Sequence, residues 1–260
     1  MNSKQAETWL ATLYIGSMVL SITSVISLVV TWQHWLMTLD GCIDVDCGCI
    51  LYGINTFRTF LGGDEKLCHF AAYSLVPVIV ISLCLGAYHG YRCCIHKNLD
   101  EPRRINRGQV YDDDRRNLNG HVVMTVKKRV AFKLWMPIGF LAAFVCCLSL
   151  AHAVVITDGY YKTCEQYRRN LIQLLNSGGR ENQAIHNRLP CGAIFDFMDY
   201  VQPDRNHWNR GEMNTAIALQ LAICTSWFSL FAWLTACSIN FIMARKRQRN
   251  LGEKFCCCCC

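Results

Sequence analysis

The chain has 260 residues, of which 52% are hydrophobic and 17% are charged, and its formal net charge is +7. All 26 Lys and Arg and all 19 Asp and Glu lie outside four long windows, a distribution that excludes an ordinary soluble domain. No nucleic-acid-binding motif accompanies the positive charge, so we attribute it to topology and membrane lipids and expect no nucleic acid partner. The charge-free windows are Thr8 to Leu39, Leu67 to Tyr91, Leu134 to Thr157 and Met213 to Ala244.

Each window is longer than the ~20 residues that an α-helix needs to cross a hydrocarbon core of ~30 Å. The sequence therefore predicts an all-α membrane protein, a four-transmembrane-helix bundle that forms a single domain over residues 1–260. The first span is too long for a signal-peptide core and lacks a small-residue cleavage site, so it is expected to remain as an anchor. The expected spans cover residues 9–33, 68–91, 134–157 and 214–243.

Charge asymmetry orients these spans. The central loop, 92–133, carries eleven Lys and Arg against five Asp and Glu, whereas the first loop carries two basic and five acidic residues. Loops rich in Lys and Arg remain in the cytoplasm. We therefore expect both termini, the central loop and the basic tail 244–260 to be cytoplasmic, and the loops 34–67 and 158–213 to be extracellular.

The third loop contains two apolar patterns. Tyr167, Leu171, Leu174 and Leu175 fall at helical spacing and predict a short amphipathic helix over the outer ends of the bundle. The aromatic run from Ala193 to Val201 must also be covered, either by the first loop or by a partner protein. The candidate partner contacts are Phe195, Phe197 and Tyr200 in this run, together with Gln220 in the fourth span. Residues 121–128 of the central loop fit a short strand or an interfacial segment and are left unassigned.

Six of the 18 cysteines lie in or beside the expected extracellular loops, and their even number in an oxidising compartment indicates disulfide bonds. They are Cys42, Cys47, Cys49, Cys68, Cys164 and Cys191. Six cysteines allow fifteen pairings. The local choices pair Cys164 with Cys191 and Cys49 with Cys68, leaving Cys42 with Cys47. A metal site at Cys47-Gly48-Cys49 is the competing interpretation, although no His accompanies it.

Cysteines on the expected cytoplasmic side have a different environment. Thiols beside the bilayer and next to Lys or Arg are typical positions of S-acylation, which would anchor the tail to the inner leaflet. A reduced, disordered tail is the alternative, and a prenylation box does not fit because the last four residues are all Cys. The S-acylation candidates are Cys93, Cys94, Cys256, Cys257, Cys258, Cys259 and Cys260.

The spans offer little chemistry. The sequence contains no metalloprotease, nucleophile-elbow or phosphate-loop motif, so we predict no enzyme activity, no cofactor and no bound metal. His152 is an ionisable residue within a span, and a packing role is weighed against a role in moving a proton or ligand. His89 and Asn214 are expected at the membrane interface, and Gln220 is expected to bridge helices.

Several segments resemble the transmembrane protein 179 family of four-pass membrane proteins. They are Cys49-Ile50-Leu51-Tyr52, Cys68-His69-Phe70, Ala87-Tyr88-His89-Gly90-Tyr91-Arg92, the pair Cys164 and Cys191, Ile217-Ala218-Leu219-Gln220, and Ser226 to Leu234. The resemblance covers mainly the second and fourth spans with their flanks. The long basic central loop and the five-cysteine tail depart from it. It implies a multi-pass membrane protein and no particular activity.

A weaker similarity connects the chain with claudin-like tetraspan proteins, including the calcium-channel γ subunits. These share cytoplasmic termini and a cysteine-bearing first outer loop. Their Gly-Leu-Trp-x-x-Cys signature is absent, and Asp40-Gly41-Cys42 is only a faint counterpart. The tetraspanin signature, Cys-Cys-Gly in the large outer loop, is also missing.

The predicted function is that of a non-enzymatic accessory subunit of another integral membrane protein, such as a channel or receptor, in the plasma membrane. A claudin-like adhesion protein is the alternative, and a small transporter built around His152 ranks third.

Overall fold

The computed structural model of the chain describes residues 3–38, 47–56, 60–95, 134–174, 179, 185, 189–201 and 213–257. Its helices are α1 (Ser3–Thr38), α2 (Glu65–Tyr73), α3 (Leu75–Ile95), α4 (Trp135–Leu174), α6 (Cys191–Val201) and α7 (Thr215–Cys257), and its strands are β1 (Cys47–Asn55) and β2 (Phe60–Asp64). The predictions made for Cys42, for residues 121–128 and for Cys258 to Cys260 lie outside the described residues.

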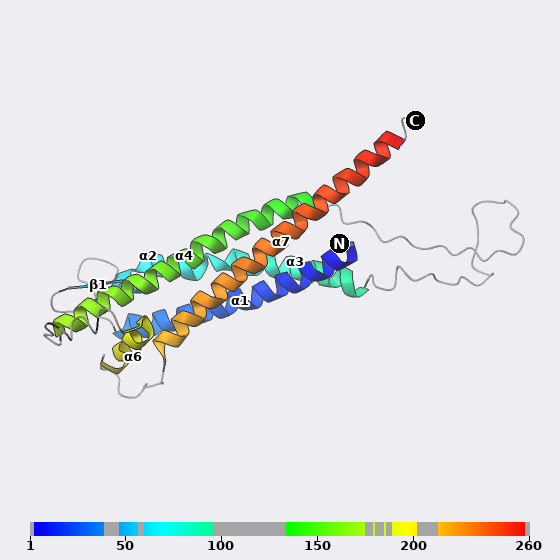
Figure 1. The fold of residues 1–260 in the computed structure, drawn as a ribbon. Helices are drawn as coiled ribbons and strands as arrows, with labels where there is room; N and C mark the ends of the chain where they lie inside the picture. Colours follow the sequence, from blue (N-terminus) through cyan, green and yellow to red (C-terminus); the bar gives the residue numbers. More distant parts are fainter. Residues whose placement is uncertain are drawn as a thin grey trace, which may run out of the picture.

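The long helices form an elongated bundle (Figure 1). Within the described residues, four helical segments are long and apolar enough to cross a membrane, which confirms the predicted number: Lys4–Leu36, Glu65–Cys94, Trp135–Gln173 and Thr215–Arg249. α1 packs along α7 and α3, and α4 packs along α7 and against β1. The start of α1 and the end of α7 lie at one end, which we name the terminal end. β1, α2 and α6 lie at the opposite end, named the loop end.

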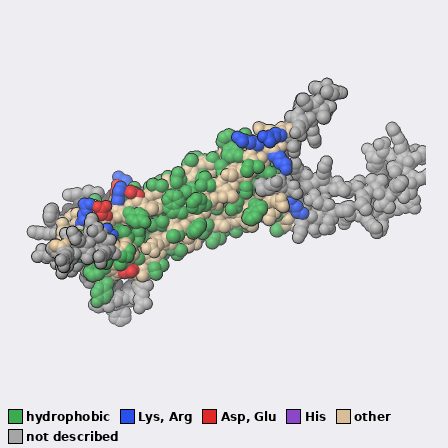
Figure 2. All heavy atoms as spheres, viewed as in Figure 1, with side chains coloured by type: hydrophobic (Ala, Val, Ile, Leu, Met, Phe, Trp, Pro, Cys, Tyr) green, Lys and Arg blue, Asp and Glu red, His purple; other side chains and the backbone are tan. Residues whose placement is uncertain are grey.

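Apolar side chains cover the middle of the bundle, and charged side chains gather at its two ends (Figure 2). Lys and Arg occur at the terminal end, whereas both signs of charge occur at the loop end. Phe140 and Phe144 on α4 and Phe228 and Phe231 on α7 are among the large hydrophobic side chains that lie exposed. A continuous apolar surface of this kind matches a hydrocarbon layer and would promote aggregation in water.

The third spanning helix extends well beyond its charge-free window. α4 has 40 residues, so at 1.5 Å per residue it is ~60 Å long, about twice the thickness of the hydrocarbon core. Tyr167 and Leu171 lie in its last turns and are buried. The separate amphipathic helix predicted for these residues is therefore wrong. No Pro lies between Thr157 and Leu174, and each added residue extends an existing helix by one hydrogen bond.

The second span, predicted as one helix, consists of two. α2 ends at Tyr73 and α3 begins at Leu75. Pro77 lacks the N–H that would donate to the carbonyl of Tyr73, so the helix is interrupted one turn before the proline. The intervening Ser74 places its hydroxyl 3.0 Å from Nδ1 of His152 on α4, which fixes the break to a neighbouring helix.

A small antiparallel sheet of β1 and β2 occupies the first loop, which corrects the all-α prediction at this point. The register shifts between Cys49 and Ile54, and Tyr52 in this interval has a φ of 60°. A Cβ on Gly63 would collide with the carbonyl oxygen of Leu51. Glycine at this position therefore allows the two strands to approach each other.

Two apolar clusters fill the bundle, and serines lie between them on α1. The loop-end cluster includes Trp35, Ile50 and Phe195, and the terminal-end cluster includes Leu10, Tyr14 and Trp233. Between the clusters, the hydroxyls of Ser17 and Ser21 lie 2.9 Å and 3.0 Å from that of Ser229 on α7, and Ser24 donates to the carbonyl of Ala222. Small polar side chains of this kind allow membrane helices to pack closely.

Substitution of Gly159 on α4 tests how tightly β1 packs on this helix. An added Cβ would lie 2.9 Å from Leu51 Cβ and 2.9 Å from Tyr52 Cε2. We expect Gly159→Ala to lower the Tm of the purified protein in detergent, because overpacking costs about 1–3 kcal/mol and exceeds the gain in helix propensity of about 1 kcal/mol.

The matched control is Gly16→Ala on α1, where nothing lies within 4 Å of the added Cβ. This variant should keep or raise the Tm. Equal shifts for the two variants would contradict the close contact of β1 with α4.

Candidate functional site

Two disulfide bonds fasten the loop end of the bundle. Cys49 of β1 is bonded to Cys68 of α2, and Cys164 of α4 is bonded to Cys191 at the start of α6. These are the local pairings that the sequence predicted. We use the name "platform" for β1, β2, α6 and the part of α4 after Thr157. One bond joins the platform to α2, and the other joins its α4 and α6 parts.

Cys47 is also disulfide-bonded, while Cys42, its predicted partner, lies outside the described residues. Because Cys47 and Cys49 are both oxidised, the metal site weighed for Cys47-Gly48-Cys49 is wrong. Throughout the part of the chain that the structure describes, no group of three His, Cys, Asp or Glu side chains is arranged to hold a metal ion.

A buried threonine connects β1 to α4. The Thr163 hydroxyl donates to the carbonyl of Ile50 at 2.8 Å and accepts from the N–H of Gly53 at 3.0 Å. The hydroxyl thus satisfies two backbone groups that the irregular register of β1 leaves without a strand partner. Sequence patterns gave no signal for this contact, because a threonine on a helix usually bonds within its own helix.

Helix α6 folds back against α4 and α7. Ile194, Phe195 and Met198 lie on its buried face, and the Phe195 ring stacks on that of Tyr160 with centroids 4.9 Å apart. The prediction that Phe195 contacts a partner protein is therefore wrong. The chain covers this part of the aromatic run itself, because burial on α4 removes the ring from water.

The other partner-contact candidates remain at the surface or at its edge. Tyr200 is 88% exposed, and Phe197 is partly buried against the loop-end cluster. Gln220 on α7 donates from Nε2 to the Tyr160 hydroxyl at 3.3 Å, so it bridges α7 and α4 as predicted. Of the four candidates, Phe195 is therefore buried, Gln220 bridges two helices, Phe197 is partly buried and Tyr200 is exposed.

Asp199 joins α6 to the start of α7. Its Oδ2 accepts the backbone N–H of Thr215 at 2.8 Å, and Asn214 Oδ1 accepts the N–H of Ile217 at 2.9 Å. These bonds cap N–H groups that a helix start leaves unpaired. Burial raises the pKa of Asp199 above its ordinary value of 3.8, although the hydrogen bonds with Thr215 oppose the rise.

The raised pKa of Asp199 predicts a pH dependence of stability. A carboxyl that binds its proton more tightly in the folded state adds stability as the pH falls through its folded pKa. Asp199→Asn keeps an oxygen acceptor for Thr215 but does not titrate. The Tm of the wild type, measured relative to this variant, should therefore rise as the pH is lowered below neutral. A difference that stays constant or falls would contradict burial of the carboxylate.

A second polar group lies at the terminal end, between α1, α3 and α7. Glu7 and Arg92 are buried, and Arg92 Nε donates to Glu7 Oε2 at 3.1 Å while Nη2 donates to Oε1 at 3.3 Å. Further along α1, the ring of His89 stacks on Tyr14 at 5.8 Å, and Asn240 Nδ2 donates to the Tyr14 hydroxyl at 3.0 Å. His89 is buried between the helices at this end of the bundle, and its predicted position at the membrane interface stays a prediction.

Two of the S-acylation candidates, Cys93 and Cys94, directly follow Arg92 of this ion pair on α3. Cys93 is partly exposed, with its Sγ 3.7 Å from the Thr8 hydroxyl, and Cys94 is exposed. Cys256 and Cys257 belong to the last turn of α7, and their side chains lie outside the described part of the structure. The α3 thiols are accessible at the helix end that carries Arg92.

His152 has a structural partner. It is buried on α4, and its Nδ1 lies 3.0 Å from the hydroxyl of Ser74 at the α2–α3 break. This contact agrees with the packing role weighed for it in the sequence.

The chain matches no protein-family model, no curated protein and no solved structure. The resemblances to the transmembrane protein 179 family and to claudin-like proteins therefore stay predictions.

The buried ion pair gives a clear mutational prediction. Removing one partner leaves a buried charge without its ion-pair partner, so Glu7→Gln or Arg92→Gln alone should destabilise the protein by about 3–5 kcal/mol. The double variant removes both charges and should be more stable than either single variant, as judged by Tm in detergent. Additive losses in the double variant would show that the two charges do not act as a pair.

Proposed function

We propose that the protein is a non-enzymatic accessory subunit of another integral membrane protein, such as an ion channel or a receptor. Its helices would pack beside those of the partner, and the platform would contact the partner's extracellular part. The lipid bilayer itself is the second partner. No catalytic residue, cofactor or metal belongs to this proposal.

The platform is the observation that carries the proposal. Two disulfide bonds, the Thr163 bridge and the Asp199 cap hold its pieces in fixed positions. On this fixed base Tyr200 is 88% exposed. A rigid support reduces the conformational entropy lost on binding, and tyrosine is enriched among the residues that dominate protein–protein affinity.

The membrane part of the chain is consistent with lateral packing. Its four windows contain no Asp, Glu, Lys or Arg, whereas transporters usually carry intramembrane charges or broken helices around a central site. The one break among the described spans, at Ser74, lies near the loop end and is bonded to His152. These features favour a helix bundle that binds a neighbour over one that conducts a solute.

Orientation and location follow from charge. We propose that the terminal end faces the cytoplasm, because Arg245, Lys246 and Arg247 follow the apolar part of α7 and the central loop is basic. The platform would then be extracellular, where disulfide bonds persist, and the plasma membrane is the proposed location. S-acylation at Cys93, Cys94 and the cysteines 256–260 would anchor the terminal end to the inner leaflet.

A claudin-like adhesion protein is the alternative that the same platform supports. In that case Tyr200 would contact a protein of the opposite cell rather than a neighbour in the same membrane. The two proposals differ in where the partner is located, so one experiment can separate them.

A photo-crosslinking amino acid in place of Tyr200, in the full-length protein expressed in cells, tests the proposal. We expect a crosslink to an integral membrane protein of the same cell, identified by mass spectrometry. The same amino acid in place of the exposed Tyr91, at the terminal end, is the matched control and should not capture that protein. Tyr200→Ala should weaken co-purification of the captured protein by about 30-fold, as expected for a hot spot of ~2 kcal/mol.

The contrary outcomes are equally specific. A crosslink found only when tagged and untagged cells are mixed would replace the accessory role by the adhesive one. Identical capture from Tyr200 and Tyr91, or none from Tyr200, would remove the platform as a contact surface.

A further inference from the structure

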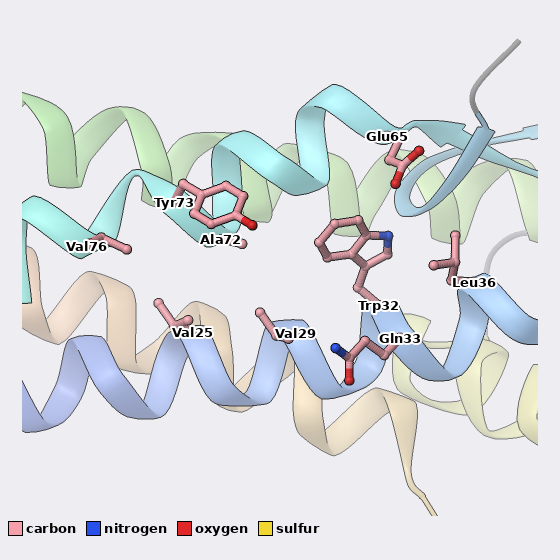
Figure 3. Close-up of a pocket in the computed structure, with 9 residues that line it drawn as sticks. All are labelled: Val25, Val29, Trp32, Gln33, Leu36, Glu65, Ala72, Tyr73 and Val76. Carbon is pink, nitrogen blue, oxygen red and sulfur yellow. The ribbon is translucent and has the colours of Figure 1, made fainter.

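A groove opens on the side of the bundle between α1 and the α2–α3 pair (Figure 3). Its volume is about 430 Å³, within the range of small-molecule sites. The groove lies in the loop-end half of α1. Its lining residues are Val25, Val29, Trp32, Gln33, Leu36, Glu65, Ala72, Tyr73 and Val76.

The break between α2 and α3 explains why the groove exists. Pro77 interrupts the helix, and the contact of Ser74 with His152 holds the break to α4. In Figure 3 α2 lies farther from α1 than the start of α3 does, and Ala72 brings only a methyl group to the gap. The helices therefore separate at a place where the small side chain does not fill the space.

The two ends of the groove differ in chemistry. Val25, Val29 and Val76 line its apolar end, whereas Trp32 and Glu65 lie at the other end (Figure 3). The charge-free window of α1 ends shortly after Trp32, which places the polar end near the membrane surface. A ligand that enters from the bilayer would thus meet an apolar channel with polar groups at the headgroup level.

Trp32 supplies an independent indication of a ligand. The residue is only 9% exposed, and its Nε1 is buried without a hydrogen-bond partner among the described residues. In Figure 3 this nitrogen points into the space between Leu36 and Glu65. The indole is held by an edge contact with the His69 ring at 4.9 Å. Buried N–H groups are normally paired, so this N–H is available to donate to a ligand in the groove.

We propose that the groove binds a sterol from the membrane. One hydroxyl can accept from Trp32 Nε1 and donate to Glu65, which a hydrocarbon chain cannot do. The rigid, flat ring system fits between the valines of α1 and Ala72, and it loses little conformational entropy on binding. Glu65, whose Oε1 lies 3.4 Å from His69 Nε2, carries a carboxylate at the polar end. A phosphate headgroup there is disfavoured by like charge.

This inference does not rest on the accessory function, because purified protein suffices to test it. The full-length protein in nanodiscs is labelled with a photoreactive sterol, and labelled peptides are mapped by mass spectrometry. We expect labels within residues 25–36 and 65–76, and competition by unlabelled cholesterol but not by excess phosphatidylcholine or phosphatidylserine.

Three variants complete the test. Val29→Trp fills the groove and should reduce labelling by about tenfold. Val30→Trp is the matched control, because Val30 is the next residue on α1, is 48% exposed and does not line the groove. Trp32→Phe keeps an aromatic ring but lacks the N–H. It should weaken sterol competition by about tenfold, as for the loss of one buried hydrogen bond.

Several results would overturn the proposal. Labels spread evenly over all four spans, or equal competition by phospholipid, would show nonspecific contact with the bilayer. Unchanged labelling in both Val29→Trp and Trp32→Phe would place the sterol elsewhere, and a crosslink from the groove to a helix of a co-purified protein would assign it to a protein partner. If Val29→Trp lowers the Tm, its loss of labelling can reflect misfolding, and the Trp32→Phe result then decides whether the groove binds the sterol.

Discussion

A backbone inside hydrocarbon has no water to bond, so each of its N–H and C=O groups must find a partner within the protein. The long helices α1, α3, α4 and α7 satisfy this requirement internally, and the sheet and short helices occur at the loop end. The α2–α3 break shows how an exception is tolerated. The Ser74 N–H still donates to the Phe70 carbonyl at 2.9 Å, and its hydroxyl contacts His152. The lateral groove and the position of α2 both depend on this supported break.

Apolar burial between helices gains little inside lipid, so polar and small residues determine how the helices pair. Ser17 and Ser21 meet Ser229 in the middle of the bundle, and Glu7 meets Arg92 at the terminal end. These contacts connect α1 to α7 and to α3 at different depths. Together they define the register of α1, while disulfide bonds and the Thr163 bridge do the same for the platform.

Charge-free windows were sufficient to predict four spanning helices, because the membrane penalises charge strongly and over a fixed length. Local spacing was likewise sufficient for the pairs Cys49–Cys68 and Cys164–Cys191. The rest depended on contacts distant in sequence. The hairpin of β1 and β2 is supported by Thr163 of α4. Phe195 is buried against Tyr160 of α4, and the residues around Phe195 give no sequence signal for this contact. Pro77 was the available signal for the broken second span.

We propose that the bundle crosses a membrane with the platform outside the cell and both ends of the chain in the cytoplasm. Antibody labelling of epitope tags on intact cells tests this topology directly. The tags are inserted into the protein one at a time, within residues 40–46 or 203–211 for the platform side and within residues 105–120 for the central loop. We expect antibody to reach the first two tags on intact cells and the third only after permeabilisation. Labelling of the central-loop tag on intact cells, or of a platform-side tag only after permeabilisation, would contradict it.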